Sequence, residues 1–304
     1  MTILDEVGVS IRQLAEGAGT SVVGIGQRWG AGSGIVFREG RVLTNAHNVR
    51  GDQVTVTFAD GRTAEGNVAG HDVDGDLAII DVETAGIPAL PWASATSAEI
   101  GMAVFALANP GGRGLRVTFG FVSGIERTFR GPRGRRITGS LEHTAPLLPG
   151  SSGGPVLTAS GELLGINTNR LGEGFYLAIP ADEALRGRAD ALARGESAAS
   201  PRLGVAIAPG HVARRLRRAV GLPDTDGLLI REGMEDSPAA RAGIAQGDLI
   251  VAAAGHPVRT PDDLFDALQA ARGGGTSELT IVRGTDERTI QVTFGGERQP
   301  DQEA

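Results

Sequence analysis

The sequence contains neither cysteine nor lysine. Without cysteine there is no disulfide, no thiolate nucleophile and no cysteine-based zinc site, and the redox compartment cannot be read from thiol usage. The absence of lysine, together with abundant alanine and glycine, indicates the codon bias of a GC-rich genome rather than a function. No apolar run approaches the ~20 residues of a transmembrane helix, so we expect no membrane span.

What is present is typical of a soluble globular chain of about two domains. The 304 residues are 40% hydrophobic and 21% charged, with a net charge of -7. An acidic balance argues against nucleic acid as a partner. Arginines cluster between positions 127 and 136 and between 214 and 218, and we interpret both clusters as solvated faces. We therefore expect no nucleic-acid partner.

The pattern changes along the chain. Residues 1–20 have helical spacing of apolar positions and end at Gly17, whereas residues 21–185 consist of short β-branched runs between glycine, asparagine and aspartate turns. Residues 186–200 form a linker in this interpretation. A second unit of mixed strands and helices spans 201–296, and 297–304 is a polar tail. The predicted fold class is mainly β, with a small α+β domain at the end.

One glycine-rich loop near the middle of the chain suits a nucleophile. Ser152 lies between Pro149-Gly150 and Gly153-Gly154, where a tight turn can aim backbone N–H groups at the oxygen of an attacked carbonyl. Another glycine run, 30–34, invites a nucleotide-binding interpretation. A strand follows that run where the phosphate motif requires a helix, so we reject phosphate binding.

Two upstream residues complete a chemistry of acyl transfer. His47 follows a strand, and Asp76 opens an apolar strand, where a buried carboxylate needs a partner such as an imidazole N–H. We predict that Ser152 attacks, His47 transfers its proton, and Asp76 fixes the imidazole tautomer. Asp72 and Asp74 lie in the preceding turn, where we expect them to be solvated.

These segments resemble the HtrA (Deg) family of chymotrypsin-like serine proteases over nearly the whole chain. Seven motifs occur in family order: Gly30-Ala31-Gly32-Ser33-Gly34, Leu43-Thr44-Asn45-Ala46-His47, Gly75-Asp76-Leu77-Ala78, Ala108-Asn109-Pro110-Gly111-Gly112, Pro149-Gly150-Ser151-Ser152-Gly153-Gly154-Pro155, Leu177-Ala178-Ile179-Pro180, and Ser237-Pro238-Ala239-Ala240-Arg241-Ala242-Gly243-Ile244.

The resemblance implies two six-stranded β-barrels with the active site between them, followed by a PDZ domain. It implies an ATP-independent endopeptidase that acts on unfolded or damaged proteins without metal or cofactor, with an oxyanion hole formed by the N–H groups of Gly150 and Ser152. The chain departs from the family at Ser151 and Leu148, where asparagine is usual.

In chymotrypsin-like enzymes, the residue six positions before the nucleophile forms the floor of the primary specificity pocket. By this resemblance the floor here is Pro146, which carries no carboxylate to pair with arginine or lysine of a substrate. With Leu147, Phe175 and Leu177 nearby, we expect a small apolar pocket that accepts residues such as valine, alanine or leucine.

The second unit, by its resemblance to PDZ domains, implies binding of hydrophobic C-terminal peptides as an added strand. Leu203-Gly204-Val205-Ala206 matches the loop that holds the peptide carboxylate. Leu264 and Leu268 would line the groove, or else pack in the core. Such peptides would regulate the protease.

A different class of function stays open: a peptide-binding or chaperone-like module with an idle protease site. The resemblance also implies a homotrimer. The acidic start of the sequence carries no export signal, which indicates a cytoplasmic protein as written. Members of the family are usually exported, so a sequence trimmed of its leader is the alternative.

Overall fold

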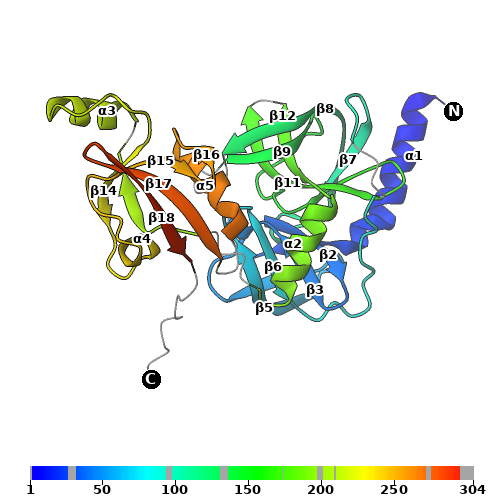
Figure 1. Cartoon of the computed structure of the whole chain (residues 1–304). Coiled ribbons are helices and arrows are strands. Elements are labelled where there is room, and N and C mark those ends of the chain that lie inside the picture. Colours follow the sequence, from blue (N-terminus) through cyan, green and yellow to red (C-terminus); the bar gives the residue numbers. More distant parts are fainter. Residues whose placement is uncertain are drawn as a thin grey trace, which may run out of the picture. The chain divides into compact units, whose positions relative to one another are not determined.

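The computed structural model describes residues 2–26, 32–93, 98–130, 136–172, 174–196, 201–208, 210–271 and 275–294. The chain divides into two compact units, Met1–Ala198 and Ala199–Ala304 (Figure 1). In the described residues, no helix has the length and apolar character that crossing a membrane requires.

The first unit consists of two closed β-barrels of six strands each, which confirms the predicted double barrel. The strand orders, β1-β2-β3-β6-β5-β4 and β7-β8-β9-β12-β11-β10, are the same in the two barrels. The first barrel contains β1 (Val22–Ile25), β2 (Gly32–Arg38), β3 (Arg41–Thr44), β4 (Gln53–Thr57), β5 (Thr63–Asp72) and β6 (Leu77–Asp81). The second contains β7 (Ala103–Ala108), β8 (Arg116–Arg130), β9 (Arg136–His143), β10 (Pro155–Leu157), β11 (Leu163–Gly172) and β12 (Phe175–Pro180). Short 3-10 turns η1 (Ala18–Ser21), η2 (Ala46–Asn48) and η3 (Pro110–Gly112) connect them.

The β-branched and leucine-rich runs fold into strands because each barrel can bury both of their faces. One apolar cluster fills the first barrel and another fills the second. A third cluster joins the barrels to each other, with Leu43 and Leu77 from the first and Leu107 and Leu163 from the second. This shared core fixes the loops of the two barrels relative to one another.

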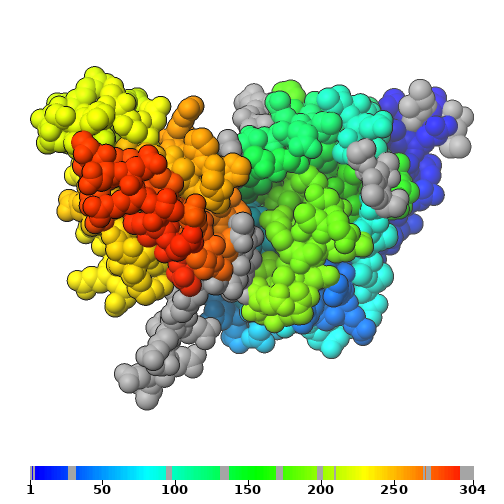
Figure 2. All heavy atoms as spheres, in the orientation of Figure 1, coloured from blue at the N-terminus to red at the C-terminus, as the bar shows by residue number. Residues whose placement is uncertain are grey.

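Two helices flank the barrels. The predicted N-terminal helix is α1 (Ile3–Glu16), which begins with a capping box formed by Thr2 and Asp5. Helix α2 (Glu183–Ala193) packs against β5 and β6, and its Ala189 and Leu192 are buried in the shared core. The opposite side of α2 faces solvent (Figure 2). The segment that we expected to be a linker from residue 186 thus begins inside a helix of the first unit.

The second unit is a sheet of antiparallel strands in the order β13-β14-β15-β17-β18, with β16 paired to β15. Its strands and helices are β13 (Val205–Ile207), α3 (Gly210–Ala219), β14 (Leu228–Gly233), α4 (Pro238–Arg241), β15 (Leu249–Ala253), β16 (His256–Pro257), α5 (Pro261–Leu268), η4 (Gln269–Ala271), β17 (Thr276–Arg283) and β18 (Asp286–Thr293). A separate apolar cluster, which includes Ile230, Ile250 and Ile281, forms its core.

The arginines of α3 are not a uniform solvated face. Arg217 is 2% exposed and donates hydrogen bonds to the carbonyls of Pro223 and Gly284. Arg214 and Arg218 pair with Asp226 and Asp224. This cluster therefore ties α3 to the loop after it.

Candidate active site

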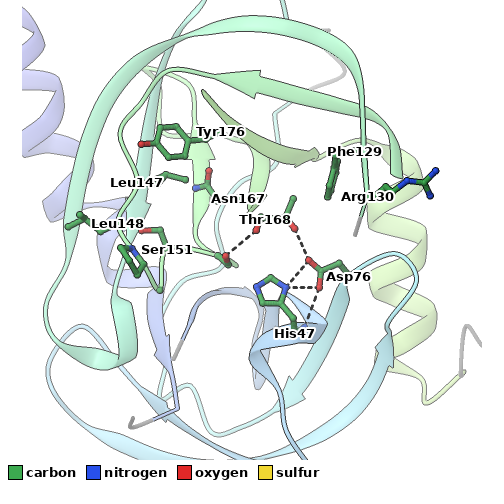
Figure 3. Close-up of a pocket in the computed structure, with 13 residues that line it drawn as sticks. His47, Asp76, Phe129, Arg130, Leu147, Leu148, Ser151, Asn167, Thr168 and Tyr176 are labelled. Atoms are coloured by element: carbon green, nitrogen blue, oxygen red, sulfur yellow. Dashed lines mark hydrogen bonds and ion pairs between the residues drawn. The ribbon is translucent and has the colours of Figure 1, made fainter. Parts of the chain in front are cut away.

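A cleft of about 550 Å³ in the first unit is lined by loops and strands from both barrels (Figure 3). The first barrel contributes two residues, and the second contributes the nucleophile loop and residues of three strands, β8, β11 and β12. Its lining residues are His47, Asp76, Phe129, Arg130, Leu147, Leu148, Pro149, Gly150, Ser151, Ser152, Asn167, Thr168 and Tyr176. The three residues predicted to act in acyl transfer are all among them.

His47 and Asp76 are in direct contact. His47 lies in η2, just after β3, and its Nδ1 is 2.9 Å from both carboxylate oxygens of Asp76. The backbone N–H of His47 also donates to Asp76 Oδ1 at 3.2 Å. Because a carboxylate only accepts, Nδ1 carries the proton, and Nε2 is left as the basic nitrogen.

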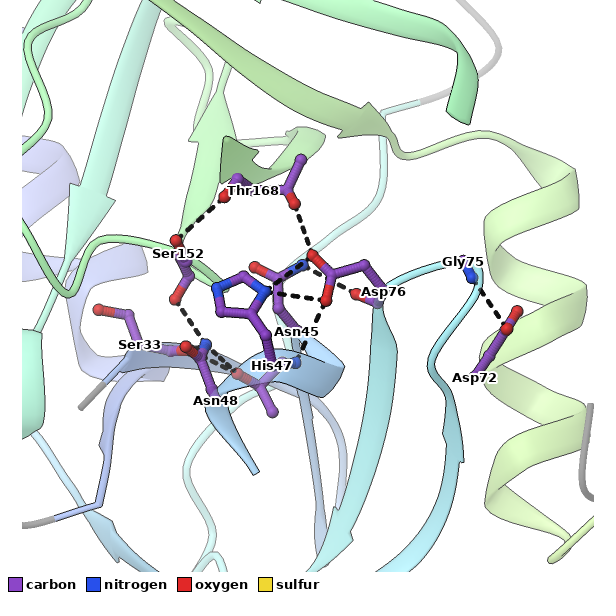
Figure 4. Close-up of polar contacts among 10 residues, drawn as sticks. Ser33, Asn45, His47, Asn48, Asp72, Gly75, Asp76, Ser152 and Thr168 are labelled. Atoms are coloured by element: carbon purple, nitrogen blue, oxygen red, sulfur yellow. Dashed lines mark hydrogen bonds and ion pairs between the residues drawn. The ribbon is translucent and has the colours of Figure 1, made fainter. Parts of the chain in front are cut away.

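The carboxylate of Asp76 is fully buried and held by a further donor. Thr168 Oγ1 donates to Oδ2 at 2.6 Å, and Asn45 Nδ2 donates to the Asp76 carbonyl at 2.9 Å (Figure 4). Asp76 has φ of 54°, a left-handed conformation that is uncommon for a residue other than glycine. The backbone is thus constrained at the point that aims the carboxylate at His47.

Ser152 is placed in the same cleft by contacts that hold its backbone. Its carbonyl accepts hydrogen bonds from the N–H of Ser33 at 2.8 Å and from Asn48 Nδ2 at 2.9 Å. Its hydroxyl donates to the Thr168 carbonyl at 3.1 Å rather than to His47. The nucleophile loop is therefore tied to the first barrel, with the hydroxyl in a resting orientation.

The turn before Ser152 has the geometry of a type II turn. The N–H of Ser151 donates to the Leu148 carbonyl at 3.1 Å, Pro149 occupies the second position, and Gly150 has φ of +88°. In the described residues, no acceptor contacts the N–H of Gly150 or that of Ser152. Ser151 and Leu148, the two departures from the family pattern, both lie in this turn. Ser151 is buried, and the side chain of Leu148 is exposed.

Glycine is required directly after Ser152. Gly153 has φ of +87°, and a Cβ there would lie 2.0 Å from the Ser33 carbonyl oxygen. This close approach lets the loop lie against β2.

The neighbouring acids differ from our expectation. Asp72 and Asp74 are 1% and 8% exposed, so the prediction that they are solvated is wrong. Asp72 caps the turn by accepting from the N–H of Gly75 at 2.9 Å (Figure 4). Its Oδ2 lies 3.7 Å from Nη1 of Arg188 in α2. The turn that carries Asp76 is therefore packed beneath α2.

The residues predicted for the specificity pocket are mostly elsewhere. Only Leu147 lines the cleft. Pro146 is exposed, Phe175 is 45% exposed, and Leu177 is fully buried. Asn167 and Tyr176 line the cleft instead. They come from the paired strands β11 and β12, and the distance along the sequence from Ser152 does not indicate this position.

Several polar residues of the site were not predicted. Thr168, Asn167, Asn45 and Asn48 all hold triad residues or the nucleophile loop. For Asn167 and Thr168 the sequence does contain an indication, because these two polar residues directly follow the apolar stretch Leu163–Ile166 within the same strand. In the described ranges, no group of three or more histidine, aspartate or glutamate side chains is placed to hold a metal ion.

In the second unit, the segment predicted to bind a peptide carboxylate lies at the start of β13. Gly204 has φ of +72°, and a Cβ there would lie 2.4 Å from the Cβ of Ser237. No acceptor in the described chain contacts the N–H of Leu203 or Gly204. β13 pairs only with β14 in the sheet order, so its other edge has no partner strand in the described part of the unit.

The predicted groove residues differ in exposure. Val205 is half-buried and Ala206 is exposed. Leu264 and Leu268 of α5 are 7% and 3% exposed and belong to the core of the unit.

Comparison with known proteins matches both units to known domain families. Residues 32–166 match a family model described as a trypsin-like peptidase domain, and residues 229–283 match one described as a PDZ domain. A protein of Synechocystis sp. named as the serine protease HhoA is 35% identical over 287 residues, which cover 89% of this chain and 72% of that relative. A DegP-like periplasmic serine endoprotease of Halomonas elongata is 33% identical over 276 residues, 88% of this chain but only 57% of the relative.

A solved structure of the HtrA-type protease AlgW with a tripeptide has a TM-score of 0.68 at 26% identity, and the match covers 96% of this chain and 99% of that one. The match to HhoA and the two domain models, on a double barrel followed by a small sheet, establish the family. The chain belongs to the HtrA (Deg) family and is a trypsin-like serine endopeptidase with one PDZ domain.

Proposed function

We propose that the protein is an ATP-independent endopeptidase that cleaves unfolded or damaged proteins, with Ser152 as nucleophile, His47 as general base and Asp76 as the residue that orients it. One observation carries the proposal. The Nδ1 of His47 is hydrogen-bonded to a fully buried carboxylate in the cleft that also holds Ser152 and the N–H groups of Gly150 and Ser152, which no acceptor in the described residues contacts.

The chemistry follows from this geometry. With Nδ1–H held by Asp76, Nε2 of His47 accepts the Ser152 proton once the hydroxyl rotates away from the Thr168 carbonyl. The serine oxygen then attacks the peptide carbonyl, and the N–H groups of Gly150 and Ser152 stabilise the oxyanion. His47 returns the proton to the leaving amine, and water hydrolyses the acyl-enzyme by the same steps.

For the substrate, we propose an apolar side chain at the cleaved position. Leu147 and Tyr176 line the cleft, and its lining holds one carboxylate, that of Asp76, which is already engaged by His47 and Thr168. Cleavage after arginine or lysine in peptide profiling would contradict this specificity.

For the second unit, we propose that it binds hydrophobic C-terminal peptides and thereby regulates the protease. The N–H groups of Leu203 and Gly204, which no acceptor in the described chain contacts, would receive the terminal carboxylate of a peptide that binds as an added strand. The edge of β13 that has no partner strand in the described chain would receive the peptide strand, which would pair with the backbone of Val205 and Ala206. Leu264 and Leu268 would form the floor of the groove from within the core.

The test is cleavage of an unfolded, casein-like protein by the wild type and by Ser152→Ala, with and without a hydrophobic C-terminal peptide. We expect turnover by the wild type alone, a loss of about 10⁵ or more in the variant, and higher turnover with the peptide. The same peptide with an amidated C-terminus is the control, because it lacks the carboxylate that the N–H groups of Leu203 and Gly204 would bind.

A binding or chaperone-like module with an idle protease site is the second candidate. The hydrogen bond from the Ser152 hydroxyl to Thr168 favours it, because this hydroxyl does not contact His47 at rest. Peptide binding without cleavage by the wild type would support this second candidate and overturn the first.

Assembly and compartment are also proposals. We propose a homotrimer, as the family resemblance implies, which light scattering of the whole protein would test. The Halomonas elongata relative is named as periplasmic. We propose that this chain also functions after export, and fractionation of cells that produce it would distinguish an exported from a cytoplasmic protein.

A further inference from the structure

A buried histidine lies behind the catalytic cleft and takes no part in the chemistry above. His143, the last residue of β9, is 0% exposed. Its Nε2 lies 2.8 Å from Asn167 Oδ1, and its ring stacks on Tyr176 with centroids 5.8 Å apart and planes at 27°. Asn167 and Tyr176 both line the cleft, so His143 supports its wall from behind.

The orientation of the Asn167 amide follows from its other contacts. Asn167 Nδ2 donates to the carbonyls of Gly154 at 3.1 Å and Pro155 at 3.3 Å. Turning the amide over would place its oxygen against two carbonyl oxygens, so Nδ2 must face them and Oδ1 must face His143. Oδ1 only accepts, and therefore His143 carries its proton on Nε2.

The two carbonyls held by Asn167 come directly after the nucleophile loop. The backbone of Asn167 reinforces the same link, since its carbonyl accepts from the N–H of Gly153 at 2.8 Å and its N–H donates to the Gly154 carbonyl at 2.9 Å. A hydrogen-bonded chain thus runs from His143 through Asn167 to the residues that follow Ser152.

We propose that His143 is a positioning residue of the protease: through its Nε2–H it fixes the Asn167 amide, which holds the chain after Ser152 in the geometry that catalysis requires. This inference rests on the assignment of Ser152 as nucleophile. Removing the Nε2–H donor frees the amide to turn, and a turned amide repels the carbonyls of Gly154 and Pro155.

The surroundings of His143 keep it neutral. Its Nδ1 is buried, and no group in the described residues hydrogen-bonds to it. Burial lowers the pKa of His143 to about 4, although the hydrogen bond with Asn167 acts in the opposite direction. Of the strands packed against it, β8 presents Val122 and β12 presents Tyr176. The neighbouring Glu142 is engaged by Ser123 and Arg127 instead.

The test compares His143→Leu with His143→Gln. Leucine removes the donor, whereas the side-chain amide of glutamine can still donate to Asn167 Oδ1. We expect His143→Leu to lower kcat by about ten- to a hundredfold with little change in KM, the effect of a slightly misplaced reacting group. His143→Gln should recover most of kcat. His71→Leu, at an exposed histidine of β5, is the control and should retain wild-type kcat.

Equal losses in the leucine and glutamine variants, or wild-type kcat in His143→Leu, would overturn the proposal. Histidine ¹⁵N NMR of Ser152→Ala gives a readout that needs neither activity nor a substitution at His143. It should show His143 as the neutral Nε2–H tautomer at pH 7, and an Nδ1–H tautomer would also overturn the proposal. An inactive wild type with this tautomer intact would contradict the nucleophile assignment instead.

Discussion

The carboxylate of Asp76 shows how single residues determine this site. A fully buried charge is stable only when its oxygens are hydrogen-bonded, and here His47 and Thr168 supply the donors. The position of Thr168 has two functions, because its hydroxyl holds Asp76 while its carbonyl receives the resting Ser152 hydroxyl. One residue of β11 therefore contacts two members of the triad.

Thr168→Val should lower kcat by about tenfold or more, because the Oδ2 atom of Asp76 loses its hydroxyl donor and the carboxylate orients His47 less well. Thr168→Ser is the matched control and should stay near wild type, because it keeps the hydroxyl. Steady-state kinetics on a peptide substrate measures the difference, and equal kcat values for the two variants would contradict this role of the hydroxyl.

His143 gives the first unit a stability that depends on pH. The pKa of His143 is lowered from 6.5 to about 4 by burial, so below pH 6.5 the unfolded chain binds a proton that the folded one excludes. The contribution is complete above pH 6.5 and is lost as the pH falls toward 4, to a total of about 3 kcal/mol. Urea unfolding at several pH values should show a steeper loss for the wild type than for His143→Gln, and parallel curves would count against it.

At the scale of elements, the sequence predicts those strands that carry their own apolar pattern. Runs such as Leu77–Ile80 and Ala103–Ala106 are strands, as their β-branched and apolar residues indicate. β5 and β9 were not predicted, because their sequences are rich in glycine and polar residues. Each pairs on both edges, so closure of the barrel makes them strands where local propensity does not.

The candidate site divides along the same line. The contact of His47 with Asp76 was predictable, since a buried acid at the head of a strand needs a partner. The wall of the cleft was not, because Asn167 and Tyr176 meet through the pairing of β9, β11 and β12. Phe175 and Leu177, which are neighbours of Tyr176 along the chain, are not among the residues that line the cleft.

An ion pair joins Asp248, the residue before β15, to Arg283 at the end of β17, and its two members are unequally buried. Asp248 is 1% exposed at its side chain and Arg283 is 40% exposed, with two contacts of 2.7 Å between them. Burial raises the pKa of Asp248, but hydrogen bonds from Arg283 and from the N–H of Ala245 outweigh it, so the pKa is lowered overall. The carboxylate depends on its partner more than the guanidinium does.

Arg283→Met should therefore destabilise the second unit by about 2 kcal/mol or more, because it removes both guanidinium donors from a buried carboxylate and leaves it with the N–H of Ala245. Asp248→Asn should cost less, since Arg283 can turn to solvent. The stability that the carboxylate contributes is present at neutral pH and is lost as the pH falls through its lowered pKa. Thermal unfolding at pH 7 gives the order of the variants, and the reverse order would refute the argument from burial.

At the scale of the whole molecule, each apolar cluster of the described residues lies within one of the two units. Every cluster of the first unit draws its residues from positions up to 193, and both clusters of the second begin at 203 or later. Leu192 is fully buried in the first and Ile281 in the second. Because hydrophobic burial is the main contribution to folding, each unit has its own source of stability.

Two unfolding transitions should follow from two cores. Leu192→Ala removes methylene groups from the core that α2 shares with the barrels and should cost about 2 to 5 kcal/mol there, while Ile281→Ala should cost a similar amount in the second unit. Scanning calorimetry of Ser152→Ala, used as background to prevent self-cleavage, should show each substitution lowering one midpoint and leaving the other. A single transition that shifts with either substitution would contradict this prediction. It would mean that the two units unfold together, with one free energy of unfolding for the whole chain.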